Sequence, residues 1–121
     1  MFNLIFGYYD RYAETFSATS TGTGWTVALG TEVPPGEVWV ITVACAHHDS
    51  TSATELEIGS RINSTDYPLN QKLSVATWER LLGVGTVILK AGDRAVAGAY
   101  NLTSGKTVYG QVLGYKMKVS Q

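Results

Sequence analysis

The chain has 121 residues, of which 45% are hydrophobic and 16% are charged, and its formal net charge is −1. This is the length of one ordinary domain with a hydrophobic core, so we expect residues 1–121 to form a single domain. The nine Lys and Arg residues lie singly along the chain, and no apolar run approaches the roughly 20 residues of a membrane-spanning helix, which argues against nucleic acid and membranes as partners.

Turn-forming residues recur about every ten residues, which is the spacing typical of a sandwich or barrel of short strands. The segments between them are rich in Val, Ile, Thr, Tyr and Trp, and none shows a helical stripe over more than two turns. The sequence therefore predicts an all-β fold. The predicted turns lie at residues 20–24, 34–36, 49–52, 63–66, 83–85, 91–93 and 101–105.

The N-terminal segment, residues 1–20, is rich in aromatic side chains and has few turn residues. It is either the first strand of the sandwich or an arm that reaches a neighbouring chain, because aromatic residues are enriched in interfaces. Residues 1–6 also lack the basic leader of a signal peptide, so we expect synthesis in a cytoplasm. The segment's predicted interface residues are Phe2, Phe6, Tyr8, Tyr9 and Tyr12.

The predicted strand at residues 37–47 is apolar on both faces. Strict alternation places Trp39, Ile41, Val43 and Cys45 on one face and Val38, Val40, Ala44 and Ala46, with Thr42, on the other. A strand of this kind is either covered by a second layer or lies in a subunit interface. Cys45 is the only cysteine, and we expect it to be a small buried hydrophobic residue.

The segment from His47 to Ile62 contains the residues most easily mistaken for a catalytic or metal site. His47 and His48 point to opposite faces of a strand, so they cannot both bind one metal without a bend. In the strand at residues 54–62, Glu55 and Glu57 share a face opposite the apolar residues, which indicates a solvated face, although such a pair can also bind Ca²⁺ weakly. We expect no catalytic, cofactor-binding or metal-binding residues, and no enzymatic activity.

The three tryptophans suggest carbohydrate binding as a second kind of function, because an exposed indole can stack on a sugar ring. Trp39 alternates with Ile41 and is expected in the core, whereas Trp25 and Trp78 are free to be exposed. Carbohydrate binding is therefore an open alternative.

The last two predicted strands, residues 94–100 and 106–119, also carry small or apolar side chains on both faces. Gly110 and Gly114 leave one face of the last strand nearly flat, so another backbone or a large side chain can approach it closely. Three such strands are more than a lone sandwich of this size needs, and we expect a homo-oligomer. The predicted interface residues on these strands are Val38, Val40, Val108 and Val112.

Several short motifs resemble those of small β-sandwich proteins encoded in the virion gene clusters of tailed bacteriophages. Residues 33–40 (VPPGEVWV) and 89–94 (LKAGDR) are similar to the family's VPAGxxWxV and LxAGDxI elements. Residues 108–117 end in a GYxM-like sequence, and residues 49–53 fit the family's turn between adjacent strands. In the AGD turn, Gly92 supplies a positive φ and Asp93 can bond to the backbone.

The resemblance implies a jelly-roll-like antiparallel β-sandwich, often trimeric. It implies a capsid decoration (cement) protein that binds over the major capsid protein of a tailed phage and stabilises the head, with the virion as its location and the bacterial cytoplasm as its place of synthesis. A tail, baseplate or fibre module, with or without glycan binding, is the alternative. The family has no catalytic residues or cofactor, and the expected partners are copies of the chain, as a homotrimer, and the capsid protein.

Overall fold

The computed structural model describes residues 5–22 and 24–120, and their side chains from residue 7 to residue 118. The prediction of an all-β fold is confirmed: the described residues form strands joined by turns, with no helix. The strands are β1 (Ile5–Thr19), β2 (Trp25–Leu29), β3 (Glu37–His48), β4 (Glu55–Ile62), β5 (Thr65–Leu73), β6 (Leu81–Leu89), β7 (Arg94–Tyr100) and β8 (Thr107–Ser120).

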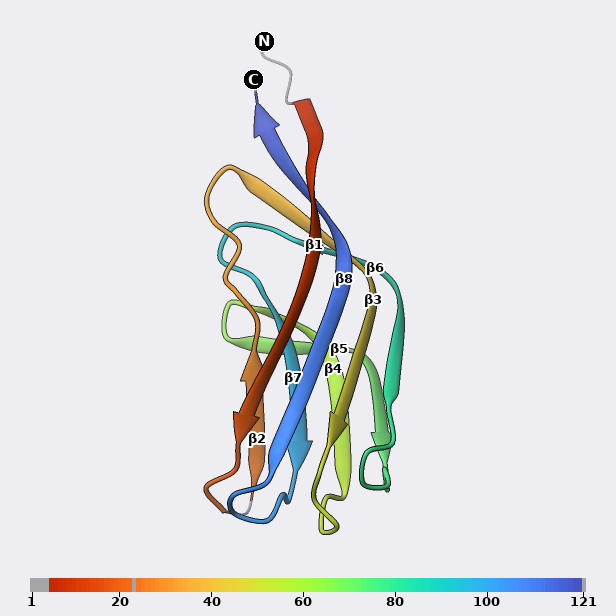
Figure 1. Cartoon of the computed structure of the whole chain (residues 1–121). Helices are drawn as coiled ribbons and strands as arrows, with labels where there is room; N and C mark the ends of the chain where they lie inside the picture. Colours follow the sequence, from red (N-terminus) through yellow and green to blue (C-terminus); the bar gives the residue numbers. More distant parts are fainter. Residues whose placement is uncertain (1–4, 23, 121) are drawn as a thin grey trace.

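The strands form two four-stranded sheets with the orders β1-β8-β3-β6 and β2-β7-β4-β5, which face each other in Figure 1. The antiparallel pairs include β1 with β8, β2 with β7, β3 with β6 and β4 with β5. These pairs describe one long hairpin rolled up on itself, which is the winding of a jelly roll. The jelly-roll-like antiparallel β-sandwich is therefore confirmed.

The core lies between the two sheets and combines small with large side chains. From β7, Ala95, Ala97 and Ala99 are fully buried, and Leu56 and Ile58 of β4 are buried beside them. Gly110 of β8 leaves the space into which the ring of Phe16 packs, since a Cβ there would overlap that ring. The flat face of the last strand is thus filled by the chain's own aromatic residue.

A β-bulge at Thr42 divides β3 into two halves. The register with both β6 and β8 shifts between Ile41 and Val43, so the alternation of side chains changes at this point. Trp39 and Ile41 face the core before the bulge, and Ala44 and Ala46 face it afterwards. The prediction that Val43 shares a face with Trp39 is wrong, because strict alternation takes no account of the extra residue.

The N-terminal aromatic segment contains the whole of β1, which pairs with β8 along its length. In Figure 1 the start of β1 and the end of β8 continue side by side beyond the end of the sandwich. Tyr12 and Phe16, farther along β1, are buried in the core. Only the first part of β1 projects from the sandwich.

Two turns follow the geometry that their residues favour. Gly92 has a φ of +93°, and the backbone N–H of Lys90 donates to a carboxylate oxygen of Asp93 at 2.9 Å. Between β4 and β5, Asn63 and Ser64 both have positive φ, as in a tight hairpin turn. The predicted turn at residues 83–85 is wrong, because Gly83 and Gly85 lie inside β6.

Candidate assembly surface

The outward side of β8, β3 and β6 forms one continuous sheet surface that contains no Asp, Glu, Lys or Arg. Its residues alternate with the core residues of the same three strands, with the change of alternation at Thr42. We call this surface the outer apolar face. It consists of Val38, Val40, Val43, Cys45 and His47 of β3, Leu82, Val84 and Ile88 of β6, and Tyr109, Gln111, Leu113, Tyr115 and Met117 of β8.

Four aliphatic side chains of the outer apolar face are exposed to an unusual degree. Val84 is 75% exposed, and Leu82, Ile88 and Leu113 are each more than half exposed. Tyr8 of β1 is 67% exposed and extends the face at one end, with its ring centroid 6.4 Å from that of Tyr115. Contiguous exposed apolar surface of this kind marks a site of interaction with another molecule.

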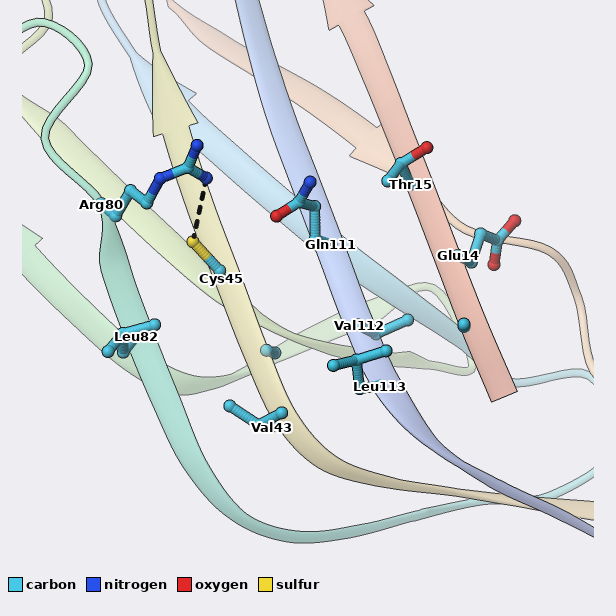
Figure 2. A pocket seen from close by; sticks show the side chains of 11 residues that line it. Glu14, Thr15, Val43, Cys45, Arg80, Leu82, Gln111, Val112 and Leu113 are labelled. Atoms are coloured by element: carbon cyan, nitrogen blue, oxygen red, sulfur yellow. Dashed lines mark hydrogen bonds between the residues drawn. The ribbon is translucent and has the colours of Figure 1, made fainter. Parts of the chain in front are cut away.

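A shallow groove of about 690 Å³ runs across this face (Figure 2). Val43, Leu82 and Leu113 line it from three adjacent strands, and Thr15 and Gln111 add polar groups toward β1. At one end the guanidinium of Arg80 reaches over Cys45, with 3.8 Å between Nη1 and Sγ. Cys45 is buried, as predicted, but it lies on the outer side of the sheet rather than in the core cluster.

The end of the face near Arg80 carries three packed rings, those of His47, Tyr109 and Trp78, which we call the ring cluster. His47 and Tyr109 are directly opposite each other on β3 and β8, and their rings stack at 4.8 Å. Trp78 lies 5.6 Å from the ring of His47 and 5.9 Å from that of Tyr109, and is 58% exposed. Burial, together with the nearby charge of Arg80, holds the pKa of His47 below its ordinary value of 6.5.

Trp78 has a φ of +65°, which is uncommon for a bulky residue. Its backbone N–H donates to the carbonyl oxygen of His48 at 2.8 Å, so this turn is tied to the end of β3. The tie keeps the indole against the two other rings of the cluster.

The outward side of the opposite sheet is different, because β4 and β5 carry charged groups there. Arg61 and Asp66 form a salt bridge with 2.6 Å between Nε and Oδ1. Glu55 accepts a hydrogen bond from Gln71 at 2.5 Å. Burial and the neighbouring carboxylates raise the pKa of Glu57. The two outer surfaces of the sandwich therefore differ in polarity, as expected if one is solvated and the other is covered.

The predicted residues of the N-terminal segment lie in three different environments. Tyr8 extends the outer apolar face. Tyr9 is 40% exposed, but its hydroxyl donates to Glu37 and its ring lies 4.7 Å from Nζ of Lys118. Phe2 lies outside the described residues, and Phe6 is described only by its backbone pairing with Val119.

Four predicted interface residues are corrected by their burial within the single chain. Tyr12, Val108 and Val112 belong to the core cluster and are at most 2% exposed, and Val40 is 4% exposed on the outer side. They have almost no surface left for a partner, since the first three are packed between the two sheets and Val40 is also buried. Val38, half-buried on the outer apolar face, is still available.

The most exposed residues of the face, Leu82, Val84, Ile88 and Leu113, were not predicted as interface residues. Three belong to β6, where the two glycines suggested a turn. Gly83 instead faces the core, and a Cβ there would lie 2.8 Å from a methyl group of Leu69. The alternation of Leu82 and Val84 around it is the signal that could have identified the strand.

The two adjacent histidines point to opposite sides of β3. His47 belongs to the ring cluster, whereas His48 is buried, with Nε2 3.2 Å from the carbonyl oxygen of Val75, and its Nδ1 accepts from the backbone N–H of Ser50. Within residues 5–22 and 24–120 no three His, Cys, Asp or Glu side chains are placed to hold a metal ion. The same residues include no helix long and apolar enough to cross a membrane.

Comparison with known proteins establishes the fold alone. No protein-family model matches the chain, and no curated sequence is similar to it. A chain of the acidic stable capsid structure of Helicobacter pylori bacteriophage KHP30 has a TM-score of 0.62 at 12% identity, over 98% of this chain and 99% of that one.

Two further likenesses are more distant. One is the virus-like particle of extra small virus from the giant freshwater prawn Macrobrachium rosenbergii, with a TM-score of 0.46 at 8% identity over 92% of this chain and 80% of that one. The other is a family 35 carbohydrate binding module from an environmental isolate, with a TM-score of 0.34 at 14% identity over 88% of this chain and 72% of that one. Neither is close enough to carry an argument.

Proposed function

We propose that the chain is a capsid decoration (cement) protein of a tailed phage. It binds as a homotrimer over the major capsid protein and stabilises the head against the pressure of packaged DNA. It is made in the cytoplasm of the bacterial host and resides in the virion. Its role is structural and needs no catalytic residues or cofactor.

The observation that carries this proposal is the outer apolar face. A contiguous exposed apolar surface of this extent marks a site of contact with another protein. Burial of apolar area there contributes roughly 25 cal/mol per Å² before the costs of association are subtracted. The likeness to a chain of the KHP30 capsid structure supports a structural role in the virion, because it extends over nearly the whole of both chains. The phage-like motifs of the sequence agree with it.

Reconstitution on particles tests the proposal. Virions produced from the genome that encodes the chain are compared with virions from the same genome lacking its coding sequence. We expect the complete virions to contain the 13.0 kDa chain, and the purified chain to bind the deficient particles saturably. Rebinding should raise the temperature at which the particles release their DNA. Absence of the chain from purified virions, or no binding to deficient heads, would contradict the proposal.

A tail, baseplate or fibre module that binds glycans is the second candidate. It is favoured by the exposure of two tryptophans, Trp78 in the ring cluster and Trp25, which is 45% exposed beside Tyr100 on the other sheet. A glycan array with tryptophan fluorescence quenching separates the candidates. Quenching by a glycan that is lost in Trp78→Ala or Trp25→Ala would support the second candidate, and no signal from the array would eliminate glycan binding.

A further inference from the structure

We propose that the outer apolar face is the surface through which copies of this chain pack against one another. This inference rests on the proposed function, which includes a homotrimer. It assigns the contact between the subunits of that trimer to one defined surface. The capsid protein then meets another part of the molecule.

The extent of the exposed apolar surface fits a protein interface. Leu82, Val84, Ile88, Leu113 and Tyr8 together expose on the order of 600 Å², at the upper end of the roughly 300–600 Å² of the largest patch on a typical monomer. The half-buried Val38, Val43, Tyr115 and Met117 add to this area. The total approaches the roughly 800 Å² that each partner contributes to a standard interface.

Polarity identifies a second copy as the occupant. A partner that packs here without penalty must also present a surface free of charged groups, because an unpaired charge buried against aliphatic side chains is strongly destabilising. In a trimer each copy contacts the next through a different part of this face, and its residues on β8, β3 and β6 include no charged side chain. Charged groups lie at the margins of the face: Arg80 and Glu14 at the two ends of the groove, and the exposed Arg11 on β1, opposite Tyr115.

The described residues of the chain leave much of this face uncovered. Among the described segments, the loop before β6 reaches over one end, where Trp78 and Arg80 lie beside His47. Elsewhere on the face Leu82, Val84, Ile88 and Leu113 are exposed, whereas Val40 and Cys45 of the central strand are buried. At that end the ring cluster supplies aromatic groups and an Arg, the residue types that most often dominate binding energy at interfaces.

Charge substitutions on the face provide the test, with a matched control on the other sheet. Val84→Asp and Leu113→Asp place a carboxylate on β6 and β8. Leu73→Asp places one on β5, at a side chain that is 67% exposed on the edge strand of the opposite sheet. Size-exclusion chromatography with light scattering at micromolar concentration gives the mass of each protein, and circular dichroism shows that each is folded. Val84→Lys serves as a second variant at the same site if Val84→Asp does not fold.

We expect the unsubstituted chain and Leu73→Asp to have three times the 13.0 kDa mass of one chain, and the two face variants to have the mass of one chain. A monomeric unsubstituted chain would overturn the inference, as would face variants that remain oligomeric. If the chain is trimeric through this face but does not bind deficient heads, the inference stands and the decoration function fails. If a monomeric chain binds heads and Val84→Asp abolishes that binding, the capsid protein is the occupant instead.

Discussion

Gly114 of β8 lies close against the backbone of β3. A Cβ at this position would overlap the backbone carbonyl oxygen of Val40, so a side chain can be accommodated only if the two strands move apart. This contact gives a physical reason for the glycine in the GYxM-like sequence near the end of the chain.

Replacing Gly114 with alanine is therefore expected to destabilise the fold by about 1–3 kcal/mol through overpacking. The free energy of unfolding in urea measures the change. Gly7→Ala is the control, because a Cβ at Gly7 has no neighbour within 4 Å and its φ is not in the left-handed region. Equal stability of the two variants would contradict the close approach of β8 and β3.

His47 is expected to make stability depend on pH. Its pKa is lowered in the folded chain, mainly by burial and then by Arg80 and His48, with Asp49 opposing. The unfolded chain, with the ordinary value of 6.5, therefore takes up the proton first as the pH falls. The contribution of neutral His47 to the free energy of unfolding is therefore complete above the pKa that this residue has in the unfolded chain. It is lost as the pH falls from that value toward the lower pKa of the folded chain.

Urea unfolding at pH 7.5 and pH 5.5 tests this dependence. The unsubstituted chain should lose more free energy of unfolding between the two pH values than His47→Phe, which keeps an aromatic ring in the cluster but cannot be protonated. An identical loss in both proteins would show that protonation of His47 is not the cause.

At the scale of the strand, β3 shows why burial could not be assigned from alternation alone. Both halves of the strand are apolar, so hydrophobicity does not reveal where the core face changes. The bulge at Thr42 makes that change, and it depends on the pairing of β3 with β6 and β8, which are distant in the sequence. Trp39 could be assigned to the core, whereas Val43 and Ala44 could not.

β1 and β8 continue beyond the sandwich. There the two adjacent tyrosines of β1, Tyr8 and Tyr9, have different environments. Tyr8 is exposed next to Tyr115 on the assembly side. Tyr9 is used within the chain: Glu37 accepts hydrogen bonds from its hydroxyl and from Nε1 of Trp39. These bonds lower the pKa of Glu37, which stays ionised beside Lys116 and Lys118.

We therefore expect Tyr8→Ser to weaken self-association without changing the melting temperature of the dissociated chain. Tyr9→Ser removes a contact within the chain and should lower that melting temperature by a few degrees, the shift expected for roughly 1 kcal/mol in a domain of this size. Sedimentation velocity over a concentration series measures the association of both variants. If Tyr8→Ser associates as tightly as the unsubstituted chain, the face does not extend to β1.

For the molecule as a whole, the sequence was sufficient to predict the fold but only part of the surface. Turn spacing and strand composition are local properties, and they predict an all-β sandwich. Val108 and Val112 lie inside because their face of β8 packs in the core together with Phe16 from the other end of the chain, and this is a property of the tertiary structure. The sequence predicts more apolar sheet surface than one chain can bury. In the structure most of this exposed surface comes from Leu82, Val84, Ile88 and Leu113.

In the assembled state we expect other protein to cover the outer apolar face. The rate at which a thiol reagent labels Val84→Cys in the assembled protein measures how well this face is covered. Leu73→Cys on the opposite sheet is the exposed reference. The unsubstituted chain, in which Cys45 is buried, gives the background rate. We predict that Val84→Cys reacts at least about tenfold more slowly than Leu73→Cys, which corresponds to roughly 1.4 kcal/mol of protection. Equal labelling rates at the two positions would contradict the account.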